Sequence, residues 1–451
     1  MSRPVSAYTH LEKSLVVSNH SSPKLGRKQL LPCLMLFFWL SSCTNADVVR
    51  FLSTPIASAP TTEGATADTI DPALASSNRL LVEGADGNLF TIDPTGADRF
   101  DLTTDASRNR SYAQATWSSS GERIGWTRVE QSGGKLESAL ITSRADGSER
   151  TEVETRFAPF YLFWSPDDSK LAYLSNWVGE AGQTIALQMV DSTDPRAEVA
   201  VVGTGQPFYF SWSPTGEKMI THVANQSVAL LTLADGDIKV LTEVAANFAA
   251  PQWSTAGDQL LFVMNEENSS QLVVTDANGE DEQLVTTLSR NDSISFGLNS
   301  AGTQLAYVET SQSVGFNAFG PLFLYDLEQE EFTQLSDGPV LAFFWSPDGN
   351  ALFFLSVEPD PDRPLLRVNV WNGEEVQSYE SFVPNATFLS NYLRFADQYM
   401  QSMHFWSPDS QAIVYAGEGE DGKEGVWVQS TQGNEPAQLV TDGLLATWSP
   451  R

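Results

Sequence analysis

An all-β fold is predicted by a motif that returns along the chain at nearly regular intervals. The stretch FWSPDDSKLAYLS, residues 163–175, reads as a strand ending at Trp-Ser, a tight Pro-Asp turn and a returning apolar strand. Related stretches recur at steps of 41 to 61 residues, at Trp117, Trp164, Trp212, Trp253, Leu298, Trp345, Trp406 and Trp448. Short apolar runs at this period, separated by Gly, Asp and Pro, are typical of four-stranded β-propeller blades rather than helical solenoids.

The two ends of the chain predict how the ring closes. Three strand-like runs, RLLVE, NLFTID and RFDLTT, precede Trp117 and lack an innermost partner, whereas LLATWSP at the C-terminus is an innermost strand without followers. Pairing the C-terminal strand with the N-terminal strands would complete one composite blade and cover exposed strand edges. Seven complete units plus this blade predict an eight-bladed propeller, and seven blades is the alternative if the unit at Leu298 is misread.

The repeated turn also carries a family resemblance. A WSPDG-type turn, an apolar strand and a later Gly-ended turn such as DANG resemble the WD-like repeat of TolB-type β-propellers, over residues 79–450. Leu298 replaces the Trp in one unit, and the Pro is missing from three units. The resemblance implies a periplasmic protein that works by docking other envelope proteins.

The N-terminal segment predicts export and a lipid anchor. The stretch RKQLLPCLMLFFWLSSC, ending at Cys43, has two basic residues before an apolar run about half as long as a membrane-spanning helix. We interpret residues 1–42 as a cleaved signal peptide. Leu-Ser-Ser before Cys43 resembles a bacterial lipobox, which implies lipidation at Cys43. An ordinary secretory signal and an uncleaved hydrophobic anchor are the alternatives.

The segment between this signal and the first strand is predicted to be a tether. Residues 43–78 are rich in Thr, Ala, Ser and Pro and show no sustained hydrophobic period. Such a composition is typical of a flexible linker. The predicted order is therefore a signal peptide, a lipidated Cys with its tether, and a propeller domain over residues 79–451.

Charge and cysteine content limit the classes of partner. The formal net charge of -31 repels phosphate backbones and anionic lipids, which disfavours nucleic acid and electrostatic membrane binding. The two cysteines, Cys33 and Cys43, both precede the propeller domain. That domain is therefore predicted to have no disulfide, cysteine nucleophile or thiolate metal site. We predict no cofactor and no metal, and expect membrane contact through the lipid anchor.

Binding is predicted on the face opposite the Trp-Ser turns, where connections vary in length. The longest is an insertion near residues 385–401, whose apolar residues keep a helical period; Asn385 or Thr387 could cap the helix. Its aromatic side chains either fill the central channel or contact a partner. The candidate partner-binding or ligand-binding residues are Phe388, Tyr392, Phe395, Tyr399, His404, Trp177, Phe316, Phe319, Tyr161 and Tyr209.

No catalytic motif stands out, so no catalytic residue is predicted. The chain has no G-x-S-x-G elbow, and neither Walker A nor G-x-G-x-x-G occurs in a strand-to-helix context. We expect a non-catalytic binding platform for an envelope or other extracytoplasmic protein. The alternative is a propeller enzyme or small-ligand receptor, in which channel-mouth acids and His404 bind a sugar or metal. A channel filled by Phe and Tyr would count against that alternative.

Overall fold

The computed structural model describes residues 77–451. The gaps in this range are 180–181, 195, 225, 246–248, 290–291, 311–312, 315–316, 319 and 361. The predicted signal peptide, Cys43 and nearly all of the predicted tether lie outside the described residues, as do Phe316 and Phe319. Within the described part of the chain, no helix has the length and apolar character needed to cross a membrane.

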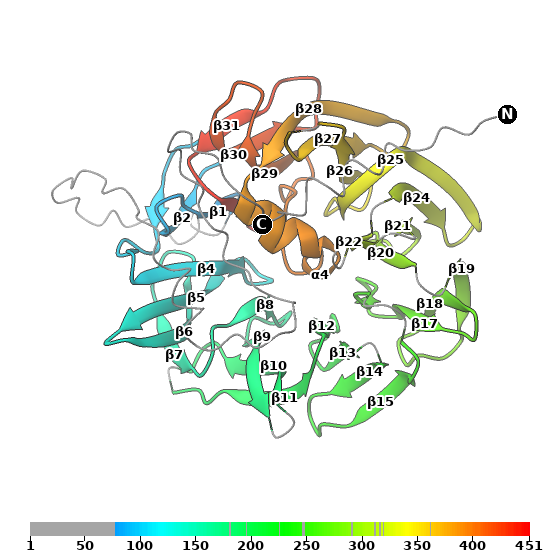
Figure 1. The fold of residues 1–451 in the computed structure, drawn as a ribbon, viewed down its shortest axis with the longest axis horizontal. Coiled ribbons are helices and arrows are strands. Elements are labelled where there is room, and N and C mark those ends of the chain that lie inside the picture. The colour runs from blue at the N-terminus through cyan, green and yellow to red at the C-terminus, as the bar shows by residue number, and fades with distance from the viewer. Residues whose placement is uncertain are drawn as a thin grey trace, which may run out of the picture.

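Four-stranded antiparallel sheets are arranged around a common centre (Figure 1). Four of these sheets each use four consecutive strands. The first has β4 (Arg110–Trp117), β5 (Arg123–Ser132), β6 (Lys135–Arg144) and β7 (Thr151–Thr155). The second has β8 (Phe160–Trp164), β9 (Lys170–Gly179), β10 (Gly182–Asp191) and β11 (Ala200–Gly205).

The next two sheets repeat this arrangement. One has β12 (Phe208–Trp212), β13 (Lys218–Val223), β14 (Ser227–Thr232) and β15 (Ile238–Thr242). The other has β16 (Gln252–Trp253), β17 (Gln259–Asn265), β18 (Ser269–Asp276) and β19 (Gln283–Ser289). In each of the four sheets the first strand ends at the Trp of the repeated motif, so the motif marks the end of a first strand.

A fifth four-stranded sheet joins the two ends of the chain. Its strands are β1 (Leu80–Glu83), β2 (Leu89–Ile92), β3 (Phe100–Asp101) and β32 (Leu445–Trp448), in the order β3-β2-β1-β32. β32 pairs with β1 in antiparallel register, with Leu80 opposite Trp448. The C-terminal strand thus lies beside the N-terminal strands, as the unpaired runs in the sequence suggest.

The remaining large sheet is continuous over ten strands. These are β20 (Ser293–Leu298), β21 (Gln304–Thr310), β24 (Gly320–Asp326), β25 (Glu331–Trp345), β26 (Leu352–Glu358), β27 (Leu365–Trp371), β28 (Val376–Pro384), β29 (Ala412–Glu418), β30 (Glu424–Ser430) and β31 (Gln438–Thr441). A small separate sheet pairs β22 (Ser313–Val314) with β23 (Asn317–Ala318).

Two long strands in this sheet change partners along their length. β25 pairs with β24 near Phe332 and with β26 near Phe344. β28 pairs with β27 up to Phe382 and with β29 at Val383 and Pro384. In β25 the pairing register is also irregular near this change of partner. The ten strands therefore divide into smaller units at β25 and β28.

The serine of the Trp-Ser motif organises the turn that follows it. In six units its Oγ accepts a hydrogen bond from the backbone N–H five residues later, as from Lys170 to Ser165 at 2.9 Å. In the unit at Leu298, Asn299 Oδ1 takes this place. At the chain ends, Ser449 Oγ accepts from Arg79 N–H at 3.0 Å. At this position the serine comes from the C-terminal end of the chain and the backbone donor from the N-terminal strand region.

At four motif positions the tryptophan links neighbouring repeat units, whereas Nε1 of Trp164, Trp253 and Trp448 has no hydrogen-bond partner in the described structure. Nε1 of Trp406 donates to the carbonyl of Phe344 at 2.9 Å, and Nε1 of Trp345 donates to the carbonyl of Gly297 at 2.8 Å. Trp212 and Trp117 make the same kind of bond to the preceding sheet. Each acceptor directly precedes the motif position of its own sheet, so the repeat has a structural role.

The predicted helical insertion lies at the centre of the ring (Figure 1). It contains a π-helix η1 (Phe388–Tyr392), a 3-10 helix η2 (Leu393–Phe395) and an α-helix α4 (Ala396–Tyr399). Asn385 Oδ1 accepts from Phe388 N–H at 2.9 Å, which confirms the cap predicted at Asn385, whereas Thr387 makes no side-chain cap bond. Residues 385–403 are called the hub below.

We predict that Trp406→Phe destabilises the fold more than Trp164→Phe. Both side chains are fully buried, but Trp164 Nε1 has no hydrogen-bond partner in the described structure. The Trp406 variant also leaves the Phe344 carbonyl without its indole donor. Losing one such bond costs about 1 kcal/mol of unfolding free energy, and more if the carbonyl is stranded. Urea unfolding of both variants measures the difference, and equal losses would contradict the role given to the indole bond.

Candidate functional site

The hub packs its aromatic side chains into the ring. Phe388, Tyr392 and Tyr399 are almost completely buried and belong to the same hydrophobic core as the inner strands around them. Phe395 is only partly buried. Of the two outcomes left open for these aromatic side chains, filling of the centre is therefore the one observed for Phe388, Tyr392 and Tyr399. The helical period could not decide between them, because it defines a face without saying which way that face points.

Hydrogen bonds fix the hub to the two sheets that contain β1 and β4. Tyr392 Oη donates to Glu83 Oε1 of β1 at 3.0 Å. Tyr399 Oη donates to Gln114 Oε1 of β4 at 3.1 Å, and Gln114 Nε2 donates to Tyr392 Oη at 3.4 Å. Ala115 N–H also donates to Glu83. These groups form one buried polar network, in which each tyrosine hydroxyl has a partner on the ring.

Tyr161 and Tyr209 also lie inside rather than at an open channel mouth. Tyr161 Oη donates to the Gln398 carbonyl of the hub at 2.8 Å. Its ring packs edge to face on Tyr399, with centroids 5.3 Å apart, and lies 5.7 Å from the ring of Tyr209. Both tyrosines are fully buried. Their role in this structure is to support the hub.

The far side of the hub contacts further inner strands. Ser211 of β12 donates to Gln401, and Gln252 Nε2 of β16 lies 3.0 Å from Met400 Sδ. A Cβ on Gly297 of β20 would lie only 2.9 Å from the same sulfur, so glycine permits this close approach. Asn385 Nδ2 donates to the Leu444 carbonyl at 2.9 Å. The hub therefore contacts inner strands around the ring.

A carboxylate is buried in the polar network. Burial raises the pKa of Glu83, and its hydrogen bonds come from neutral donors, the Tyr392 hydroxyl and the Ala115 amide. Neutral donors stabilise a carboxylate less than a paired cation would. Glu83 therefore favours its protonated form more than an exposed glutamate does.

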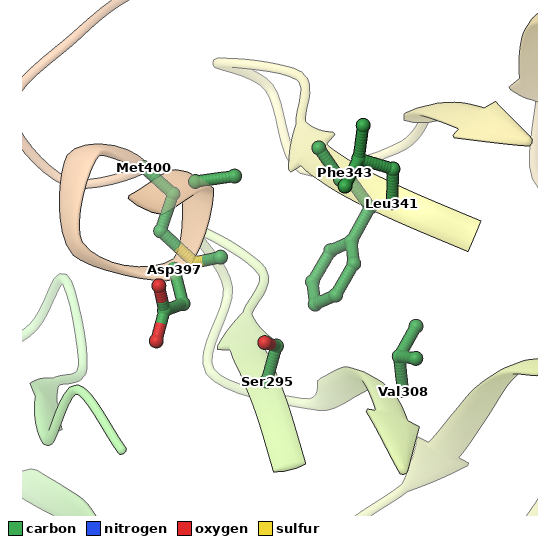
Figure 2. Close-up of a pocket in the computed structure, with 8 residues that line it drawn as sticks. Ser295, Val308, Leu341, Phe343, Asp397 and Met400 are labelled. Atoms are coloured by element: carbon green, nitrogen blue, oxygen red, sulfur yellow. The ribbon is translucent and has the colours of Figure 1, made fainter. Parts of the chain in front are cut away.

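A cavity of about 10 Å³ lies between the hub and the strands β20, β21 and β25 (Figure 2). Its walls are Ser295, Val308, Leu341, Ala342, Phe343, Ala396, Asp397 and Met400. A space of this size holds about one water molecule, whereas sites for small organic ligands are typically hundreds of Å³. This cavity is therefore too small for a sugar.

The two histidines of the domain occupy separate environments. His404 is partly buried, and burial lowers its pKa to about 4; its backbone carbonyl accepts from Trp448 N–H at 2.7 Å. His222 is fully buried, with Nδ1 2.8 Å from the Ala249 carbonyl, and its pKa is also lowered to about 4 by burial. Among the residues that the structure describes, no three His, Cys, Asp or Glu side chains gather to hold a metal ion.

Two long hairpins project from the face that carries the hub. β9 pairs with β10 as far as Gly179, beyond Leu174, the last residue paired with β8. β5 and β6 likewise pair as far as Ser132 and Lys135, beyond the contact of β6 with β7 at Ser138. In antiparallel sheets both hairpins lie opposite the Trp-Ser turns, at the end where β28 enters the hub.

The hairpins carry exposed apolar side chains. Leu136 is 52% exposed and Val178 is 47% exposed. Trp177, a candidate from the sequence, is partly exposed and lies 5.2 Å from the guanidinium of exposed Arg156. Leu136 and Val178 were not among the predicted site residues; the only sequence signal is that each lies within a few residues of a glycine turn. These four residues are called the hairpin surface below.

Comparisons with known proteins agree with this architecture. The family described as TolB beta propeller domain matches residues 122–377, more than half of the chain. The chain belongs to the TolB β-propeller family. No curated protein matches it.

Solved structures are similar in fold. A eukaryotic initiation factor is 10% identical with a TM-score of 0.51, over 83% of this chain and 98% of that chain. TolB from Acinetobacter baumannii is 16% identical with a TM-score of 0.37, over 70% and 88%. An oligogalacturonate lyase in complex with manganese is 12% identical with a TM-score of 0.46, over 74% and 86%. At these identities the likeness concerns the fold alone.

We predict that Tyr392→Phe destabilises this TolB-family domain by about 1–3 kcal/mol at neutral pH, since the variant deprives buried Glu83 of a donor. The Tyr392 hydroxyl lowers the pKa of Glu83, so removing it raises that pKa further. The loss should therefore be smaller in acid, where Glu83 is neutral, and grow as pH rises.

Urea unfolding at acidic and neutral pH measures this effect. Tyr379→Phe is the matched control, because the Tyr379 hydroxyl is buried without a hydrogen-bond partner in the described structure. That control should change the unfolding free energy little at either pH. A Tyr392 variant that behaves like the control would show that the hydroxyl does not support the carboxylate.

Proposed function

We propose that this protein is a non-catalytic binding platform, a lipid-anchored extracytoplasmic propeller that docks another envelope protein. The observation that supports this most directly is the filling of the centre by the hub. Phe388, Tyr392 and Tyr399 occupy the place where a channel-mouth enzyme or receptor would need room for its ligand. Docking on the outer surface needs no such room.

Cellular location is part of this proposal. The resemblance of this chain to TolB-type propellers implies a periplasmic location. The segment ending at Cys43 has the pattern of a signal peptide with a lipobox. A lipid on Cys43 followed by the tether of residues 43–78 would hold the propeller near a membrane without fixing its orientation. Such a tether suits a protein that must reach a partner in the envelope.

The ring is proposed to have eight blades. Five four-stranded sheets each supply one blade. Dividing the ten-stranded sheet where β25 and β28 change partners supplies three more. In the last of these, the innermost strand is reduced to a bridge between Trp406 and Ile413. The pairing of β1 with β32 supports closure of the ring.

The hairpin surface is the proposed docking site. Exposed apolar side chains beside an arginine and a tryptophan are the residue types that dominate binding energy in protein interfaces. Trp177 and Arg156 already contact each other, so part of the ordering cost of binding is met in the free protein. Projection beyond the neighbouring strands lets Leu136 and Val178 reach a partner without distortion of the blades.

We predict that Trp177→Ala combined with Val178→Ser abolishes capture of the partner. The assay is crosslinking and affinity capture of the lipidated protein from its own membranes, with partners identified by mass spectrometry. The control combines Ile238→Ser with Val240→Ser, which removes apolar side chains that are 63% and 46% exposed on the outer strand β15. Loss of one dominant envelope protein with the hairpin variant alone supports the proposal, and its retention refutes this placement.

Substitutions in the hub cannot serve this purpose. Phe388→Ala with Tyr392→Ala would remove two buried rings and one buried hydrogen bond. Each aromatic truncation in a core costs about 3–5 kcal/mol, so lost capture would report lost folding. The hairpin variants avoid this problem because their side chains are at least partly exposed.

A further inference from the structure

Asp397 is the most unusual charged residue of the hub. Only 2% of it is exposed, at the start of α4, and neither carboxylate oxygen has a hydrogen bond of normal geometry among the described residues. Figure 2 shows its side chain beside the cavity, across from Ser295 of β20. An ionised carboxylate in such a place is costly unless it is paired.

Nothing packed against Asp397 supplies a compensating positive charge. The cavity residues Ser295, Leu341 and Phe343 on β20 and β25 are uncharged. The titratable groups that face it are Tyr161 on β8 and Tyr209 on β12, whose pKa values its negative charge helps to raise. No lysine, arginine or histidine in the described part of the chain contributes to its environment.

Two acidic groups lie on elements around the hub, but neither contributes to the raised pKa of Asp397. Glu83 on β1 reaches the hub through Tyr392, and half-buried Glu309 on β21 adjoins the cavity residue Val308. Glu309 itself has its pKa raised by burial and by Asp292. The cost of ionising Asp397 therefore comes from its burial and not from a neighbouring carboxylate.

Water in the adjoining cavity can solvate an ionised Asp397 only in part. Its volume of about 10 Å³ accommodates about one water molecule, whereas an exposed carboxylate is solvated by several. An ionised Asp397 would gain much more solvation if α4 moved out of the ring. The same movement would carry Tyr399 away from Tyr161 and uncover the Tyr161 ring on which it packs.

We propose that the hub is a proton-controlled lock. With a neutral Asp397 side chain the hub stays packed in the ring, and ionisation of Asp397 loosens the hub and gives access to the aromatic centre. This inference concerns the hub alone and does not depend on the docking role of the hairpin surface.

The direction of the pH effect follows from burial. Burial raises the pKa of Asp397 to about 7, and the nearby amides of Asp397 and Gln398 offset this only in part. An exposed aspartate has a pKa of about 4. The proton is therefore held more tightly in the closed hub, so its contribution to closure is full below about pH 4 and is lost as pH rises to about 7. Within that window the equilibrium constant for opening of the hub rises roughly tenfold per pH unit.

Hydrogen exchange of the hub amides tests this proposal. Leu389, Met400 and Met403 donate hydrogen bonds within the hub, so their protection reports its closure. We compare the intact protein with Asp397→Asn between about pH 5 and pH 7, where the wild-type opening equilibrium should rise roughly a hundredfold. The Asn variant, which cannot ionise at this position, should show a much smaller rise once the chemical exchange rate, common to both proteins, is divided out; the rise that remains comes from Glu83, whose pKa is also raised by burial.

Controls separate the lock from general charge effects. Asp442→Asn removes an exposed carboxylate and should follow the wild type. Asp397→Ser supplies a second neutral variant if the Asn protein does not fold, and its opening equilibrium should show the same reduced rise with pH. Parallel loss of protection in the wild type and either neutral variant would overturn the proposal, as would a wild-type hub whose protection does not change with pH.

Discussion

Indole N–H bonds from one repeat unit to a carbonyl of the preceding unit, made by Trp117, Trp212, Trp345 and Trp406, are the interaction that sets neighbouring units in position. The buried indole nitrogens of Trp164, Trp253 and Trp448 make no such bond in the described structure. Trp212, Trp345 and Trp406 each donate to the residue just before the neighbouring motif. The adjacent serine meanwhile ties the turn to the next strand. One dipeptide thus stabilises a hairpin locally and sets its neighbour at a fixed position. Where Leu298 replaces Trp, Asn299 keeps the turn, but the indole donor is lost.

The ring in turn explains the hub. Inner strands that converge on a centre leave apolar side chains facing one another across a space that must be filled. Tyr392 and Tyr399 fill it with large rings, and their hydroxyls require partners because buried polar groups are costly when unpaired. Glu83 and Gln114 supply those partners from different sheets. The same packing that stabilises the centre leaves a cavity of only about 10 Å³ beside the hub, between it and the strands β20, β21 and β25.

The net charge of the whole chain and the single buried carboxylate Asp397 have different consequences. The net charge of -31 is spread over the chain and governs which partners approach. Asp397, by contrast, matters because it has neither solvent nor a positive partner. The function proposed above separates these roles, since the exposed hairpins would meet the partner while the hub packs against the inner strands.

The sequence by itself determined the strand-turn unit, its period and the neighbours at the chain ends, because each depends on residues close together in the chain or on an unpaired strand at each end. It offered Asn385 and Thr387 as caps, and the structure uses Asn385. The tertiary structure alone decided that Phe388 faces inward, that Asp397 is buried, and that the hairpins at Leu136 and Trp177 project. A helical or alternating period defines faces, but only packing against distant strands decides which face is buried and where a strand loses its neighbour.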